Sequence, residues 1–357
     1  MKKPLKKSVK ALIIALCVIA FLFVCFLSIT IYVKHEMSKP VFEFPEIIEE
    51  KAVCELPADS KTAFELLSSA YTGALNSDDA EISFKTDVSF DGEITSPLSE
   101  ADNAVLSRAY SQAADNFSKL YPSCENVKIP QAKDIPEIDF SEDDIIDFTA
   151  EHGRTTDSGE LEDEELYYIA LSVNPQAVNA NSDSEIYSKI LETASPLVKV
   201  TGYEVEVKEI SADYTVNRYS GRIMSLKLSR ELLIKASVEI PDSKTATLEI
   251  PMKTVTEIEF LYYGIHFTQR QMVVKPKDMK ALPLEAWINS EATGDDYELN
   301  FTVSKDGILK IDGDGVVSVL AASEEPFTVR AELKYNGKTY TDELVMYSTE
   351  KEVQTDE

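Results

Sequence analysis

The segment Lys310–Val319, KIDGDGVVSV, contains the side chains of a calcium loop. Asp312 and Asp314 stand two positions apart with Gly315 after them, and proteins hold Ca²⁺ with carboxylate oxygens at such spacings. The register of an EF-hand fails, because placing Gly315 sixth puts a lysine at the first ligand position and an alanine at the twelfth. Since apolar runs flank the segment, we predict a structural turn formed by Asp312, Gly313, Asp314 and Gly315.

The histidines and the known catalytic motifs give little support for an enzyme. His35, His152 and His266 are the only histidines, and no two share the spacing of zinc ligands. The chain contains neither G-x-S-x-G nor C-x-x-C. Carboxylates are frequent enough for a glycosidase pair, but Trp287 is the only tryptophan that could stack on a sugar. We predict no catalytic residue, no metal ligand and no cofactor.

Four cysteines divide into two pairs. Cys17 and Cys25 lie in a long apolar segment, whereas Cys54 and Cys124 lie outside it. In an oxidising compartment the outer pair could form a disulfide with only one connectivity. The alternative, two separate free thiols, is equally compatible with the sequence.

An acidic stretch separates two parts of the central region. From Asp134 to Glu165 the chain has 14 acidic residues and one basic residue, Arg154. Clustered carboxylates could collect Ca²⁺, but these have no ordered ligand spacing. We therefore interpret the stretch as a solvated acidic loop.

An N-terminal segment is predicted to cross a membrane. Ala11–Val33 is a run of 23 uncharged residues, and a helix needs about 20 residues to span the hydrocarbon core. Five lysines precede it, which predicts a cytoplasmic N-terminus and an extracellular remainder. A cleaved signal peptide is the alternative, but no A-x-A site follows. We predict an uncleaved anchor that uses the lipid bilayer as a partner.

The charge of the chain excludes one class of partner. Asp and Glu number 63 against 35 Lys and Arg, which gives a formal net charge of −28. Five of the lysines precede the apolar segment, so the part of the chain after Lys10 has a still more negative net charge. Such a surface repels polyanions, and we predict that the protein does not bind nucleic acid.

The central region combines helices with strands. Apolar residues at helical spacing predict one helix with Phe64, Leu67, Tyr71 and Leu75 on its buried side and a second with Val105, Ala109, Ala113, Phe117 and Leu120. A short helix is predicted around Ser184–Thr193. Strand patterns then follow at 198–210, 222–228, 232–240, 245–250 and 255–267. This order predicts an α+β domain with its helices on an antiparallel sheet.

The C-terminal region shows only short strands and turns. Residues 297–303 and 327–335 alternate between apolar and polar side chains. Between Tyr335 and Lys338, Asn336-Gly337 predicts a tight hairpin because both central residues of such a turn need positive φ. The pattern predicts a small β-sandwich over 268–349.

The segment Phe301–Ala322 resembles a bacterial Ig-like domain of group 2. Ser304 matches a serine of the family pattern, and Asp312 and Gly315 match its turn. The matching core and strand positions are Ile308, Ile311, Val316 and Val317. Phe301 stands where the family usually has tryptophan. The resemblance implies an Ig-like sandwich of the type found in cell-surface and adhesion proteins of the intimin and invasin group.

The sequence thus predicts a single-pass bacterial membrane protein. Its expected parts are a cytoplasmic tail (1–10), a transmembrane anchor (11–33), a juxtamembrane stalk (34–57), an α+β extracellular domain (58–267), an Ig-like sandwich (268–349) and an acidic tail (350–357). The expected function is non-catalytic binding, adhesion or spacing, with a surface protein or an envelope polysaccharide as partner. The alternative is an envelope enzyme, or a ligand-binding or sensory ectodomain, centred on residues 58–267.

Overall fold

The computed structural model describes residues 41–44, 48, 51–90, 94–96, 98–155, 161–179, 183–240, 244–288, 292–293 and 296–353. The predicted tail and anchor at 1–33 lie outside these residues, as does most of the predicted stalk and the end of the acidic tail. In the part of the chain that is described, no helix is long and apolar enough to span a bilayer. The described residues form two compact units, which we call the central unit (within 50–264 and 286–292) and the C-terminal unit (within 41–49, 265–285 and 293–353).

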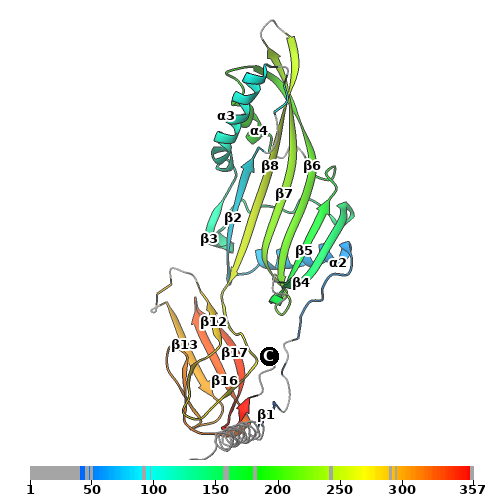
Figure 1. The fold of residues 1–357 in the computed structure, drawn as a ribbon. Coiled ribbons are helices and arrows are strands. Elements are labelled where there is room, and N and C mark those ends of the chain that lie inside the picture. The colour runs from blue at the N-terminus through cyan, green and yellow to red at the C-terminus, as the bar shows by residue number, and fades with distance from the viewer. Residues whose placement is uncertain are drawn as a thin grey trace, which may run out of the picture. The chain divides into compact units, whose positions relative to one another are not determined.

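The central unit is built on one seven-stranded sheet (Figure 1) in which every neighbouring pair is antiparallel. The strand order is β3-β2-β8-β7-β6-β5-β4. The strands are β2 (Ala80–Ser89), β3 (Cys124–Lys128), β4 (Ile145–Thr155), β5 (Leu161–Val173), β6 (Lys199–Asn217), β7 (Arg222–Ile240) and β8 (Lys244–Tyr262).

Three helices cover one face of this sheet: α2 (Ser60–Leu75), α3 (Glu100–Ser118) and α4 (Ser184–Glu192). Short 3₁₀ turns occur at η1 (Ile129–Gln131) and η2 (Glu142–Asp144). Asp59 and Ser99 accept hydrogen bonds from backbone N–H groups in the first turns of α2 and α3, which fixes where these helices begin.

The helix positions were predicted correctly, and the buried face of α3 was predicted correctly in part. Phe117 is buried, and Ala113 and Leu120 pack against the apolar core, as predicted. Val105, however, is 57% exposed, whereas Leu106 and Tyr110 are buried. The start of the predicted stripe is therefore rotated by about one residue from the buried face. The aromatic ring of Tyr110 needs the sheet-facing position because only there can so large a side chain leave water.

The covered face holds two apolar cores, one at each end of the long strands. The first lies under α2 and includes Leu67, Ile169 and Phe260. The second lies under α3 and α4 and includes Tyr110 and Ile234. Even-numbered residues of β7 and β8 enter both cores, so single continuous strands join them.

The strands β7 and β8 are longer than predicted. Each runs for 19 residues without a break, whereas the sequence pattern divided them near Arg230 and Pro251. Arg230 remains in the strand because its guanidinium pairs with Asp139 at 2.7 Å. Pro251 stays opposite Leu233 in the β7–β8 register. The predicted turn at 241–244 lies almost wholly outside the described residues.

The C-terminal unit consists of small sheets with short strands, which is compatible with a sandwich. One sheet has the order β10-β17-β16-β13 and another β11-β15-β14, and two-stranded pairs β1-β18 and β12-β9 complete the set among the described residues. The bounds are β1 (Val41–Phe42), β9 (Gly264–Phe267), β10 (Gln271–Val274), β11 (Met279–Ala281), β12 (Leu284–Trp287), β13 (Tyr297–Val303), β14 (Leu309–Ile311), β15 (Val316–Val319), β16 (Ser323–Tyr335), β17 (Lys338–Ser348) and β18 (Glu352–Val353).

The predicted Asn-Gly hairpin is confirmed. Tyr335 pairs with Lys338 at the end of the β16–β17 ladder. The two residues between them, Asn336 and Gly337, have φ values of 50° and 76°. This is the backbone that matches the right-handed twist of the flanking strands.

Candidate functional site

The Asp-Gly segment joins β14 to β15. The Oδ1 atom of Asp312 accepts hydrogen bonds from the backbone N–H of Asp314 (3.1 Å) and Val316 (2.8 Å). Gly315 has a φ of 75°, and its N–H donates to the carbonyl of Asp312 at 3.2 Å. The carboxylate of Asp312 is therefore used within the turn.

Another carboxylate of the C-terminal unit, Asp342 on β17, is the centre of a dense cluster. It accepts from the backbone N–H of Phe267 at 2.7 Å and from the Arg270 guanidinium at 2.7 Å. His266 Nδ1 lies 3.3 Å from the same carboxylate. Burial alone would raise the pKa of Asp342, but hydrogen bonds from His266, from backbone N–H groups and from Arg270 outweigh it and hold the pKa well below its usual range.

The second described histidine, His152 on β4, lies beside Arg218. Arg218 NH1 is 2.8 Å from His152 Nε2, and that nitrogen is also 2.7 Å from the carbonyl of Glu164. The guanidinium stacks over the ring of Tyr219 and donates to its hydroxyl at 2.5 Å. These contacts tie together the ends of β4, β5 and β6.

Cys54 and Cys124 are free thiols in the structure and have different partners. Cys54 Sγ donates to the carbonyl of Arg218 (3.7 Å), and Cys124 Sγ donates to that of Ile82 (3.5 Å). Cys124 belongs to β3 and Arg218 follows β6, which is four strands further along the sheet. Burial raises the pKa of both thiols, which makes them poor nucleophiles at neutral pH.

We expect both thiols to react with a maleimide after denaturation without reductant. A disulfide needs Cα atoms within about 7 Å of each other. Neighbouring strands are about 4.8 Å apart, and the partners of the two thiols lie four strands apart, so the two cysteines are too distant to bond. The intact mass of the unlabelled chain should not change on reduction. A mass that rises by two hydrogens on reduction would show that Cys54 and Cys124 are bonded after all.

A polar cluster lies between the two cores on the covered face. Arg230 projects from the middle of β7 and pairs with Asp139 at 2.7 Å. Burial raises the pKa of Asp183 at the start of α4, and the nearby Arg230 opposes this rise. Burial likewise raises the pKa of Tyr187 on α4. The Arg230 guanidinium thus ties the segment around Asp139 to the sheet, and its charge acts on Asp183 at the start of α4, which is a structural role.

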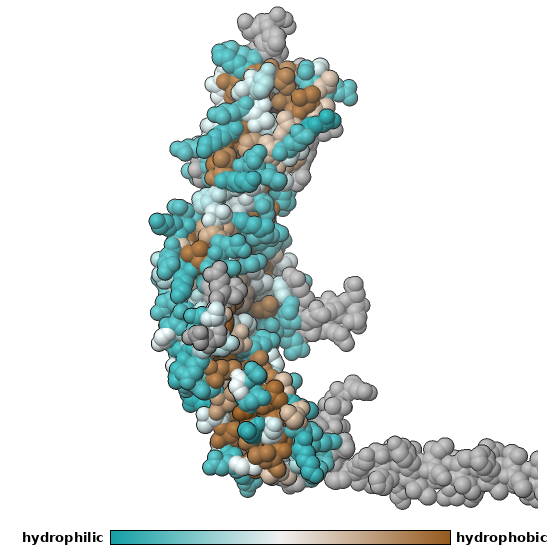
Figure 2. Space-filling model, turned by 90° about the vertical axis from the view of Figure 1, so that its left-hand side faces the viewer, coloured by the Kyte–Doolittle hydropathy of each residue, from teal (hydrophilic) through white to brown (hydrophobic). Residues whose placement is uncertain are grey.

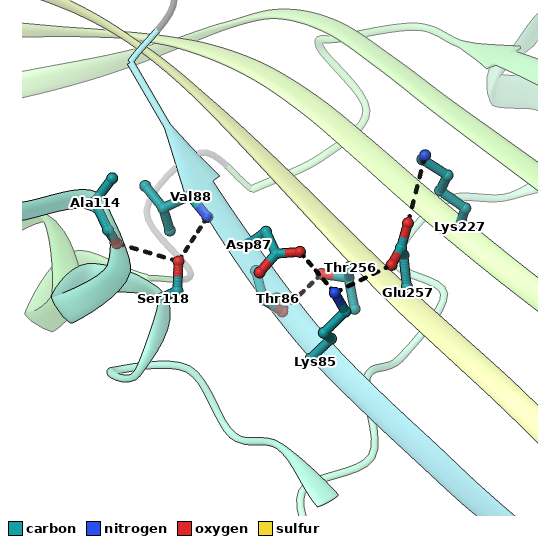
Figure 3. Close-up of polar contacts among 9 residues, drawn as sticks. All are labelled: Lys85, Thr86, Asp87, Val88, Ala114, Ser118, Lys227, Thr256 and Glu257. Carbon is teal, nitrogen blue, oxygen red and sulfur yellow. Dashed lines mark hydrogen bonds and ion pairs between the residues drawn. The ribbon is translucent and has the colours of Figure 1, made fainter. Parts of the chain in front are cut away.

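The uncovered face of the sheet carries rows of ion pairs (Figure 3). Glu257 on β8 lies between Lys85 on β2 and Lys227 on β7, at 3.5 Å from each amine. Lys85 also pairs with Asp87 at 3.0 Å. On the other side of β2, Ser118 Oγ accepts from the N–H of Val88 and attaches the end of α3 to the strand.

The same uncovered face has a shallow polar hollow of about 290 Å³. Its lining consists of carboxylates, amines and hydroxyls: Glu209, Ser211, Asp213, Lys227, Ser229, Glu231, Lys253 and Val255. Such a surface can hydrogen-bond a hydroxylated ligand, but it lacks the aromatic rings on which sugars usually stack. The surface drawn in Figure 2 is mainly hydrophilic and is interrupted by separate hydrophobic patches.

The acidic stretch is a loop only in part. Residues 134–141 form neither helix nor strand, as predicted, whereas the residues after them form η2, the whole of β4 and the start of β5, and 156–160 lie outside the description. Within the described residues, no group of three or more His, Cys, Asp or Glu side chains could hold a metal ion. The sequence pattern also gave no signal for Asp342, Arg218 or Arg230, whose partners come from distant parts of the chain.

No family model matches the chain, and a search of the curated proteins finds no significant match. What the protein does is therefore inferred from its own residues and their geometry.

Proposed function

We propose that the protein is a membrane-anchored bacterial surface protein with a non-catalytic binding, adhesion or spacer role. The observation that carries this proposal is the uncharged run Ala11–Val33 with five lysines before it. The acidic body favours a partner other than nucleic acid, such as a surface protein or an envelope polysaccharide.

The C-terminal unit is proposed to be an Ig-like sandwich. The likeness of Phe301–Ala322 to group 2 of the bacterial Ig-like domains supports this, together with the Asn-Gly hairpin and the turn at Asp312. Modules of this kind serve as spacers and adhesion domains, which is the role we assign to the unit.

The first described strand supports a position of this unit close to the membrane. β1 pairs with β18 in parallel, and Phe42 and Phe44 pack on Tyr347 with ring centroids 5.0 and 5.7 Å away. Val41 follows Val33 by eight residues, a length that spans at most about 29 Å. An anchored chain would therefore hold the C-terminal unit within this distance of the bilayer.

The membrane topology can be tested with an epitope tag placed after Glu357. In intact cells, with the outer envelope permeabilised where one exists, we expect an external protease to remove the tag. We also expect the full chain to stay in the membrane fraction after carbonate extraction. A tag protected until the cell membrane is lysed, or a chain released by carbonate, would contradict the proposal.

A second candidate is an envelope enzyme or a ligand-binding ectodomain in the central unit. The polar hollow favours it, because Glu209, Asp213 and Glu231 bring three carboxylates to one surface. Hydrolysis of cell-wall material by the purified full chain, abolished by Asp213→Asn, would establish this candidate over the first. If the chain hydrolyses nothing and binds no soluble wall fragment through these residues, the second candidate fails.

A further inference from the structure

One edge of the seven-stranded sheet is open. β4 is the last strand in the order, and of the described strands only β5 pairs with it. Figure 1 shows it as the outermost strand at that end of the sheet. The β4–β5 ladder has irregularities at Ile145/Asp147 and at His152/Arg154. Between them, residues 147–152 form a regular edge, and such an edge can accept another strand.

Two hydrogen bonds fix which backbone groups of β4 point outward. Arg218 N–H donates to the carbonyl of Glu165 at 2.8 Å, and Asn174 N–H donates to that of Asp144 at 2.7 Å. Alternate residues of an antiparallel strand bond to opposite sides. Odd-numbered residues of β5 therefore bond to β6, and even-numbered residues bond to β4.

The register between β4 and β5 shows which residues of β4 bond to β5 and which point outward. Asp147, Thr149 and Glu151 stand opposite even-numbered residues of β5 and bond to them. The N–H and C=O groups of Phe148, Ala150 and His152 therefore point away from the sheet. An independent observation agrees: the N–H of Phe148 donates to the side chain of Asp147 at 2.9 Å in place of a neighbouring strand.

The charge around this edge selects its partner. The side chains of Asp147 and Glu151 are exposed and project on one face of β4, and the exposed Asp143 precedes the strand. A second copy of β4 would bring the same carboxylates onto one face, which like-charge repulsion disfavours. An extended segment with Lys or Arg at every second position would place its cations beside Asp147 and Glu151 instead.

We propose that the outer edge of β4 binds an extended cationic peptide segment by strand addition. The backbone groups of Ala150 and His152 supply hydrogen bonds, and the two carboxylates select alternating basic residues. This site deepens the proposed binding role because it names a class of partner. It rests on the proposed function in one respect only, which is the expectation that the partner lies outside the cell.

The test uses the full chain in a non-ionic detergent with fluorescent ten-residue peptides. One probe alternates Lys and Val, a second alternates Glu and Val, and a third has the first composition in two blocks. We expect the alternating Lys-Val peptide to bind at least tenfold more tightly than the other two. On binding, hydrogen exchange at the amides of Ala150 and His152 should slow at least tenfold.

Two variants at one position separate strand addition from charge attraction. Ala150→Pro removes an outward N–H and no β5 bond, so we expect at least a tenfold loss of peptide affinity. Ala150→Ser keeps the N–H and should bind within twofold of the parent. Reversing both charges, with Asp147→Lys and Glu151→Lys, should shift the preference to the Glu-Val peptide.

Equal binding of the blocked peptide, or unchanged binding by a folded Ala150→Pro chain, would overturn the proposal. If circular dichroism shows that Ala150→Pro does not fold, the exchange of the two amides in the parent chain decides. Peptide binding in detergent does not depend on topology. If no peptide binds, the topology shown by the epitope tag is unaffected. If the tag proves to be inside the cell, the peptide result is likewise unaffected.

Discussion

Replacing Asp342 with alanine is expected to lower the free energy of unfolding of the C-terminal unit by about 2–4 kcal/mol. The carboxylate accepts from the N–H of Phe267 and from Arg270, both at 2.7 Å, and only 17% of its side chain is exposed. Alanine leaves these donors without the acceptor that they have in the native chain. Hydrogen exchange of β9 and β17 in the full chain measures the loss.

Glu343→Ala is the matched control, because Glu343 is the exposed neighbour on the same strand. It should change the exchange of β17 by no more than about 0.5 kcal/mol. Equal effects of the two variants would show that the Asp342 cluster adds no stability.

The stabilisation by Asp342 should also depend on pH in a defined direction. Since the native pKa of Asp342 is lowered, the unfolded chain binds a proton more readily than the folded chain. The contribution is fully present above the unfolded-state pKa of about 3.9 and is lost as the pH falls through the native pKa. The difference in stability between the parent and Asp342→Ala should therefore narrow below about pH 4.

The sequence predicts well the elements whose signal is local. The helical spacing of Phe64, Leu67, Tyr71 and Leu75 marks α2, and Asn336-Gly337 marks the β16–β17 hairpin. Both depend on residues within a few positions of each other, so periodicity and turn chemistry suffice. The wrong placement of Val105 on the buried face of α3 has a different origin, since Val105 and Leu106 are equally apolar and only the sheet decides which is buried.

The polar clusters could not be predicted because their members are distant in sequence. Arg270 and Asp342 are 72 residues apart, and Arg230 and Asp139 are 91 apart. A single Arg or Asp in a strand gives the same sequence pattern whether its side chain faces solvent or a partner from a distant segment. The open edge at β4 is hidden for a related reason: its acidic pattern indicates a loop, and only the strand order shows that it ends a sheet.

Gly315→Val is expected to destabilise the C-terminal unit by about 2–4 kcal/mol. Gly315 has a φ of 75°, a conformation that β-branched residues rarely adopt. A Cβ atom there would contact the ring of Phe301 at 3.4 Å, so the cost of valine comes mainly from the backbone conformation. The strained turn should loosen both strands that it joins, and hydrogen exchange of β14 and β15 would report this loosening.

Gly313→Ala is the control for Gly315→Val. No atom lies within 4 Å of a Cβ at Gly313, and its φ is not positive, so alanine should be neutral within about 0.5 kcal/mol.

The double change Asp312→Asn and Asp314→Asn tests the rival calcium site. A lysine occupies the first ligand position, and Asp312 Oδ1 already accepts two backbone hydrogen bonds. We therefore expect calorimetric titration with Ca²⁺ to give the same result for the parent and for this double variant. Loss of Ca²⁺ binding in the double variant, with Gly315→Val harmless, would make the segment a metal loop and not a turn.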